Sequence, residues 1–158
     1  MEEIKKMNPG PLGLLGFGMT TILLNLHNAG FMKLSMVIVG MGMAMGGTAQ
    51  IIAGILSFKK GNTFAGTAFS AYGVFWFSLV FIWLLGPKYD LVADKISMGF
   101  YLSVWGLFTT FMAIGTRDHS FVSKLVFWSL ALLFFTLALG DFLDNGTITI
   151  IAGYIGIA

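Results

Sequence analysis

Long stretches without any charged side chain follow one another along the chain, separated by short polar or basic turns. The uncharged windows run over residues 7-32, 34-58, 61-87, 96-116, 125-140 and 145-158. About 20 apolar residues cross a hydrocarbon core about 30 Å thick, so four of these windows can span a membrane as helices. The fifth becomes long enough if it begins near Phe121 and Lys124 extends its ammonium group to the headgroups. The pattern predicts an all-α integral membrane protein.

The predicted transmembrane helices lie near residues 12-32, 35-57, 64-85, 97-116 and 121-140. A further apolar segment, 147-158, would be about 18 Å long as a helix, which is too short to cross alone. We expect it to be the first part of a sixth helix at which the printed chain stops, with a re-entrant segment as the alternative. Because the connections are short, residues 1-158 are expected to form a single transmembrane domain.

The distribution of basic residues predicts the orientation in the membrane. The N-terminus, the 58-63 loop and the 117-124 loop hold two each, whereas Lys33, Lys88 and Lys95 fall on the other side. The positive-inside rule then places the N-terminus and the C-terminal end in the cytoplasm. We expect a multi-pass protein of the plasma, or inner, membrane.

Composition supports the membrane assignment and excludes several functions. The chain is 57% hydrophobic and 10% charged, against about 25% charged in soluble domains. Its basic residues form no continuous face, so nucleic-acid binding is not expected. The absence of cysteine excludes disulfides and thiol catalysis. The spans lack a paired acid, base or nucleophile, and we find no phosphate-binding loop or metal-ligand cluster, so we predict no enzyme, cofactor or metal.

The first predicted helix carries an unusual number of uncharged polar side chains. After Pro9 and Pro11, which suit a helix entry, the polar residues are Thr20, Thr21, Asn25, His27 and Asn28. Such groups cost free energy in hydrocarbon unless they are paired or face water. We interpret them as the lining of a pathway; the alternative is that they join neighbouring helices by hydrogen bonds.

Small residues recur every four positions in the second helix, at Gly42, Gly46 and Gly54, with Gln50 between them. This stripe is mainly a packing signal. The Gln50 amide either bridges to a neighbouring helix or reaches into a cavity, and both interpretations stay open.

Hydroxyls in the later helices can bond the preceding helical turn and so indicate no function; they belong to Ser103, Thr109, Thr110, Ser129 and Thr136. Asp141 and Asp144 are expected in a solvated loop.

The segment Asn8-Pro9-Gly10-Pro11-Leu12-Gly13-Leu14 opens a longer pattern that continues through 16-28, 46-50, 59-64 and 72-73. This pattern resembles the acetate/succinate transporter family, also called the GPR1/FUN34/YaaH family, whose signature usually has Ala in place of Gly10. The family motif residues carried over are Asn8, Pro9, Pro11, Leu12 and Gly13. The resemblance covers essentially the whole chain and implies similarity to bacterial and archaeal acetate/succinate-proton symporters.

The resemblance also implies an architecture and a site. It implies six transmembrane helices per protomer, a hexamer, and a separate pathway through each protomer. By motif position, the apolar constriction of that pathway would be formed by Phe17, Tyr72 and Leu130.

The predicted function is therefore a proton-linked channel or transporter for small carboxylates, acetate or succinate, held in the lipid bilayer as a homo-oligomer. No span contains an internal Lys or Arg, so binding would rest on neutral groups, namely Thr20, Thr21, Asn25, Asn28 and Gln50. Protons would enter with the neutral acid or through His27. Two alternatives stay open: a channel for a neutral solute such as water or ammonia, and a non-transporting membrane subunit or sensor that packs through the glycine stripe.

Overall fold

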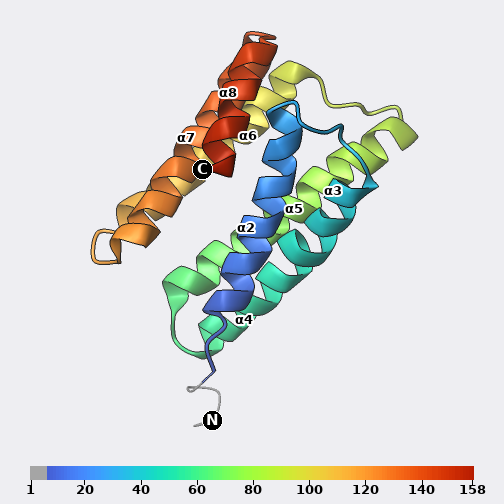
Figure 1. Ribbon diagram of the computed structural model, residues 1–158. Helices are drawn as coiled ribbons and strands as arrows, with labels where there is room; N and C mark the ends of the chain where they lie inside the picture. Colours follow the sequence, from blue (N-terminus) through green and yellow to red (C-terminus); the bar gives the residue numbers. More distant parts are fainter. Residues whose placement is uncertain (1–6) are drawn as a thin grey trace. The chain divides into compact units, whose positions relative to one another are not determined.

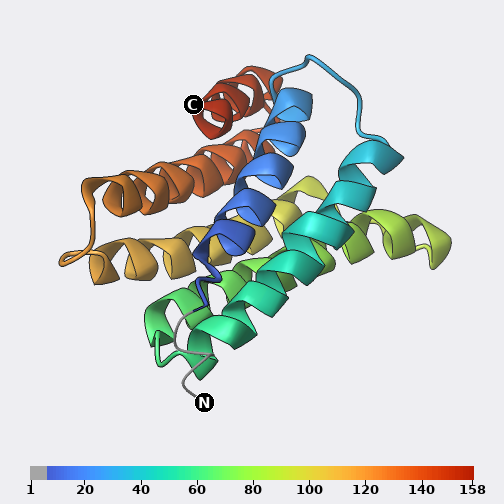
Figure 2. The same cartoon turned by 60° about the horizontal axis from the view of Figure 1, so that its bottom comes forward.

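The computed structural model describes residues 7–158, and every regular element within them is a helix, as expected (Figures 1 and 2). Lys5 and Lys6, which contribute to the predicted charge bias, lie outside the described residues. The chain forms two compact units. The first contains the chain as far as Leu23 together with Leu34–Val92, and the second contains Leu24–Lys33 together with Ala93–Ala158.

Helix α2 spans Gly10–Asn28 and therefore contributes residues to both units. It ends at Asn28, before the predicted end near residue 32. The reason is local: Gly30 has a φ of 86°, which glycine adopts at little cost, and its N–H donates to the carbonyl oxygen of His27 at 2.9 Å. This is the usual left-handed closure of a helix C-terminus.

The second predicted span is continuous but is not uniformly α-helical. It consists of α3 (Met36–Met41), the π-helix η1 (Gly42–Ala49) and α4 (Gln50–Lys59). A π-helix has a wider turn than an α-helix, is rare, and often lies at functional positions. It was not predicted from the sequence.

Helix α5 (Thr63–Lys88) packs along η1 and α4 in the first unit (Figure 1). Asn62 caps its N-terminus, because the side-chain oxygen accepts a hydrogen bond from the backbone N–H of Ala65 at 3.0 Å. The observed helix contains the predicted 64-85 span.

The glycine stripe of the second span packs against α5, which confirms the packing prediction. A Cβ atom at position 46 would lie 2.5 Å from Cγ of Trp76, and one at position 47 would lie 2.8 Å from the Phe77 ring. From the other side, a Cβ atom at Gly73 would lie 2.9 Å from the carbonyl oxygen of Gly47. Only glycine allows the two backbones to approach this closely.

The second unit contains α6 (Lys95–Gly115), α7 (Phe121–Phe142) and α8 (Gly146–Ile157). Helix α7 packs against both α6 and α8. Asp94 caps α6, and the hydrogen bonds that it accepts from the Ser97 hydroxyl and N–H lower the pKa of this carboxyl group. The hydroxyls that were expected to bond the preceding turn do so, at Ser103, Thr109, Thr110, Ser129 and Thr136.

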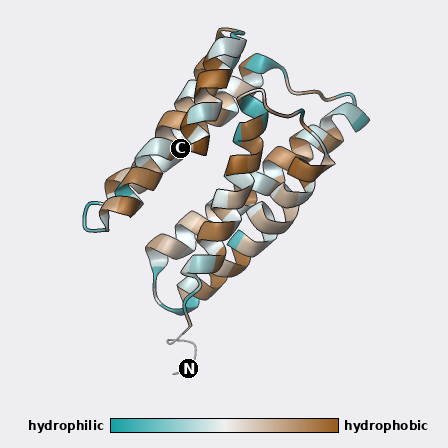
Figure 3. Ribbon diagram, in the orientation of Figure 1, coloured by the Kyte–Doolittle hydropathy of each residue, from teal (hydrophilic) through white to brown (hydrophobic). Residues whose placement is uncertain are grey.

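Among the described residues, four helices are long and apolar enough to cross a membrane: Met36–Lys59, Thr63–Lys88, Lys95–Gly115 and Phe121–Phe142. Helix α2 has 19 residues, and its C-terminal half carries the polar side chains from Thr20 to Asn28. Helix α8 is an apolar helix of 12 residues. Hydrophobic colour dominates the helices and hydrophilic colour gathers at the connections (Figure 3). Apolar side chains also cover much of the outer surface of these helices, as a lipid environment requires.

Candidate functional site

The centre of the candidate site is an aromatic contact between Phe17 of α2 and Tyr72 of α5. Their ring centroids are 5.8 Å apart and the ring planes are tilted by 45°. Tyr72 is 4% exposed, and Phe17 is half-buried. The structure thus brings together two of the three residues that the family resemblance assigned to a constriction.

Two glycines bring α2 close enough for this contact. A Cβ atom at Gly13 would lie 2.5 Å from the ring of Phe69 in α5, and one at Gly16 would lie 2.6 Å from the carbonyl oxygen of Met45 in η1. Gly13 belongs to the motif that opens the family pattern. Its role here is steric, because any side chain at this position would displace the Phe69 ring.

Thr20 lies one helical turn from Gly16 and is 1% exposed. Its hydroxyl donates to the carbonyl oxygen of Gly16 at 2.6 Å and lies 3.1 Å from that of Phe17. The hydroxyl proton is therefore used inside α2. Thr21 is half-buried beside it. These contacts satisfy Thr20 within its own helix, and its part in lining a pathway stays a prediction.

Gln50, at the beginning of α4, is fully buried, with 0% exposure. Its side-chain nitrogen donates to the carbonyl oxygen of Gly46 at 2.9 Å, within the same helical run. The other amide atom, Oε1, has no hydrogen-bond partner among the described residues, and a buried acceptor left in this state costs about 1–3 kcal/mol. The amide thus forms no hydrogen bond to a neighbouring helix within residues 7–158, and its reach into a cavity stays a prediction.

Asn25 and Asn28 lie in the second unit, at the end of α2. Asn25 is 1% exposed and accepts a hydrogen bond from the Asn28 side-chain nitrogen at 3.1 Å. Its amide fills the space beside Gly156 of α8, and Gly153 packs in the same way on the backbone of Ala29. This geometry favours the interpretation that Asn25 holds helices together.

Leu130, the third residue assigned to the constriction, lies in α7 of the second unit and is 5% exposed.

His27 is half-buried, and its Nδ1 lies 3.0 Å from the carbonyl oxygen of Met32. Because a carbonyl oxygen only accepts, Nδ1 carries a proton in this arrangement.

The acidic residues near the end of α7 differ from each other. Asp144 is exposed and forms an ion pair with Lys95, as expected for a solvated loop. Asp141 does not lie in a loop: it belongs to the last turn of α7 and is half-buried. Helix α7 continues past the predicted end at residue 140 as far as Phe142, whose ring packs against Phe100 of α6 with the ring centroids 5.1 Å apart. Within residues 7–158 no group of three or more His, Cys, Asp or Glu side chains could hold a metal ion.

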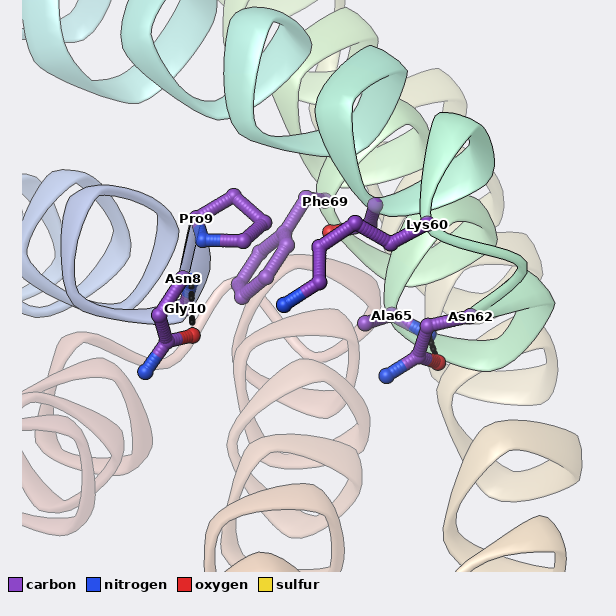
Figure 4. A pocket seen from close by; sticks show the side chains of 8 residues that line it. Asn8, Pro9, Gly10, Lys60, Asn62, Ala65 and Phe69 are labelled. Carbon is purple, nitrogen blue, oxygen red and sulfur yellow. Dashed lines mark hydrogen bonds between the residues drawn. The ribbon is translucent and has the colours of Figure 1, made fainter. Parts of the chain in front are cut away.

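A cavity of about 90 Å³ opens in the first unit where α2 begins and where α4 meets α5 (Figure 4). Asn8, Pro9, Asn62 and Phe69 contribute to its wall, and Lys60 is the charged residue that lines it. The Asn8 side-chain oxygen accepts a hydrogen bond from the N–H of Gly10 at 3.1 Å. Each asparagine therefore uses its oxygen at a helix start, and the NH₂ group of each can donate to a further acceptor.

This cavity was not predicted from the sequence, although its residues were identified separately as a motif and as a basic turn. The available signal was the pair of asparagines, each standing just before a predicted helix start. Two such starts at one end of a bundle direct backbone N–H groups toward the same region.

The fold and the site together define a multi-pass membrane protein in which a polar helix is packed by glycines against apolar helices. The model of the GPR1/FUN34/yaaH family matches residues 1–158, and the chain belongs to this family.

Relatives and a solved structure agree with this assignment. The chain is 52% identical to the succinate-acetate/proton symporter SatP of Escherichia coli K12, over 99% of this chain and 84% of that protein. It is 36% identical to the ammonia transport outward protein 2 of Saccharomyces cerevisiae, over 97% of this chain and 57% of that protein. A solved structure described as the bacterial acetate channel SatP matches with a TM-score of 0.93 and 52% identity, over 96% of this chain and 84% of that one.

Proposed function

We propose that the chain is a protomer of a channel or transporter for small carboxylates, acetate and succinate, in the plasma or inner membrane. The observation that carries the proposal is the combination of 52% identity with a TM-score of 0.93 to the bacterial acetate channel SatP. This identity and this TM-score support one shared fold. No enzymatic activity is proposed, because the relatives are described as a symporter and a channel.

In the proposed mechanism, substrate passes through each protomer by way of a constriction that contains Phe17, Tyr72 and Leu130. The Phe17 and Tyr72 rings form a dry segment, which resists hydrated ions because their hydration shell would have to be removed. Uncharged polar groups line the adjoining parts, and these groups are Thr20, Thr21, Asn25, Asn28 and Gln50. Neutral lining groups favour weak binding and fast passage.

The cavity beside Lys60 is proposed as the cytoplasmic mouth of the pathway. The ammonium group of Lys60 attracts carboxylates, which are anions at neutral pH because carboxyl groups titrate near pH 4. The NH₂ groups of Asn8 and Asn62 and the N-termini of α2 and α5 add donors to the same region.

Replacing Lys60 with glutamine should weaken substrate capture without blocking passage. We expect the K60Q variant to raise KM for acetate about two- to fivefold at low ionic strength with little change in maximal rate. Lys60 is half-buried, and a charge near the surface contributes up to about 1 kcal/mol and is screened by salt. Initial rates in proteoliposomes at two salt concentrations measure this. Lys59 is the control: it is exposed and does not line the cavity, so K59Q should leave KM unchanged. Equal effects of both substitutions would reject Lys60 as a mouth residue.

The proposed assembly is a homo-hexamer of protomers that each contain six transmembrane helices in a single transmembrane domain, with the N-terminus in the cytoplasm. The 19 residues of α2 match the length of a membrane crossing. The α8 segment would begin the sixth crossing. Exposed apolar side chains on the helices suit both lipid and protomer contacts.

Flux into proteoliposomes tests the proposed function. Purified protein should accelerate the uptake of labelled acetate above that of protein-free vesicles, and succinate should compete. The second candidate is a channel for ammonia, which the similarity to the yeast ammonia transport outward protein favours. Ammonia flux without acetate flux would select that candidate and reject carboxylate transport.

A further inference from the structure

The side-chain oxygen of Gln50 is buried without a hydrogen-bond partner among the described residues. Among residues 7–158, Gln50 Oε1 is the buried side-chain nitrogen or oxygen without a hydrogen-bond partner. The orientation of the amide is fixed chemically, because its other atom faces the carbonyl oxygen of Gly46 at 2.9 Å and must therefore be the NH₂ group. The unpaired atom is then an acceptor, and the group that satisfies it must be a hydrogen-bond donor.

Gln50 packs against the part of α2 that carries Phe17. Its Cγ atom lies 3.3 Å from where a Cβ atom of Gly16 would stand, and Gly16 directly precedes Phe17. On the other side, Gly73, which directly follows Tyr72, packs against Ile51, the residue after Gln50. Gln50 therefore packs against the residue before Phe17, and the residue after Gln50 packs against the residue after Tyr72.

The protonation state of the substrate decides whether it can donate a hydrogen bond to Gln50 Oε1. An ionised carboxylate has only acceptor oxygens, whereas a protonated carboxylic acid has one O–H donor. A carboxylate beside Oε1 would meet another acceptor with no positive charge nearby, because Lys, Arg and protonated His are absent from the contacts described around Gln50. The acid form would instead donate to Oε1.

We propose that Gln50 selects the protonated, neutral form of the acid at the aromatic contact, an inference that rests on the proposed carboxylate transport. The acid takes up one proton before the contact, donates its O–H to Gln50 Oε1 during passage, and releases the proton after it. One proton therefore crosses with each monocarboxylic acid, no net charge moves, and no residue of the chain has to titrate. Selection by a neutral acceptor explains how proton coupling arises without an acidic residue in the middle of a span.

The test uses purified protein in proteoliposomes that contain a pH-sensitive dye, with labelled acetate outside and the membrane potential set by potassium and valinomycin. All rates are taken as the excess over protein-free vesicles at the same pH. We expect one proton per acetate, no change in rate when the potential is reversed, and a fall of about tenfold per pH unit above the pKa of the acid, which is about the decrease in its neutral fraction. Acetate flux driven by the potential without proton movement would overturn the inference while leaving carboxylate transport intact.

Gln50→Leu removes the acceptor at similar volume and should lower the acetate rate about tenfold, while thermal unfolding of the purified variant stays at or above that of the wild type because a buried unpaired group is lost. Gln50→Met is the second variant if the first does not fold. Unchanged transport in a folded variant would mean that a water molecule satisfies Oε1, and would overturn the inference. Ammonia flux without acetate flux would reject the proposed function and, with it, the acid as the donor.

Discussion

Phe17→Ala and Tyr72→Ala variants are expected to transport succinate faster relative to acetate than the wild type does. The two rings meet at 5.8 Å, and truncating either one widens the narrowest part of the proposed pathway. The ratio of succinate to acetate rates should rise by about tenfold, the order of effect that pocket size has on selection between substrates. Uptake of the two labelled acids by proteoliposomes measures the ratio.

The matched control is Tyr72→Phe, which keeps the ring and removes the hydroxyl. It should retain the wild-type ratio, because the rings and not the hydroxyl would set the width of the proposed constriction. Folding must be checked separately, since Tyr72 is 4% exposed and large-to-small substitutions in a core cost about 3–5 kcal/mol. Well-folded alanine variants with unaltered uptake of both acids would reject the gate.

Gly46→Ala is expected to destabilise the protein. The new methyl group would lie 2.5 Å from Cγ of Trp76, which is 2% exposed. Overpacking of this kind costs about 1–3 kcal/mol. For a domain of this size the midpoint of thermal unfolding falls by about 2–4 °C per kcal/mol, which tryptophan fluorescence of the detergent-solubilised protein can follow.

Gly40→Ala is the control on the same helical run. No atom lies within 4 Å of where its Cβ would stand, and replacing a helical glycine with alanine gains about 0.5–1 kcal/mol. The two alanine variants should therefore shift the unfolding temperature in opposite directions. Similar shifts would show that the close approach of η1 to α5 does not determine stability.

The helices were predictable from the sequence because their limits have simple physical causes. Uncharged windows long enough to cross a bilayer are bounded by Lys59, Lys88 and Lys95, and the observed helices end or begin at these residues. Capping groups at Asn62 and Asp94 reinforce the limits. The close packing of the glycine stripe against a neighbouring helix was also predictable, since regularly spaced small residues in a membrane helix allow another backbone to approach.

The π-helix and the missing hydrogen-bond partner of Gln50 Oε1 were not predictable from the sequence. Gly42–Ala49 consists of small and flexible residues that also fit an α-helix, so the sequence does not distinguish the two helix types. The same limit applies to Gln50, because the number of partners that a side chain finds depends on tertiary contacts. Asp141 was assigned to a loop on the basis of its charge, whereas α7 continues to Phe142, whose ring packs on Phe100 of α6.

The aromatic pair has a different origin. Nothing in the spacing of residues 17 and 72 predicts that they meet; the family resemblance assigned both to a constriction, and the structure shows the ring contact. For Leu130 the structure adds its burial in α7, and its part in the constriction stays a prediction.

The most direct test of the central claim places a single thiol at Phe17. The chain has no cysteine, so a Phe17→Cys variant carries one reactive site, and Phe121→Cys, at a position 77% exposed at the beginning of α7, is the control. Each variant is treated with a small methanethiosulfonate reagent, modification is confirmed by mass spectrometry, and labelled acetate uptake is measured. Modification at position 17 should stop uptake, acetate should slow that modification, and modification at position 121 should change nothing. Undiminished uptake by protein fully modified at position 17 would contradict passage of carboxylates beside Phe17.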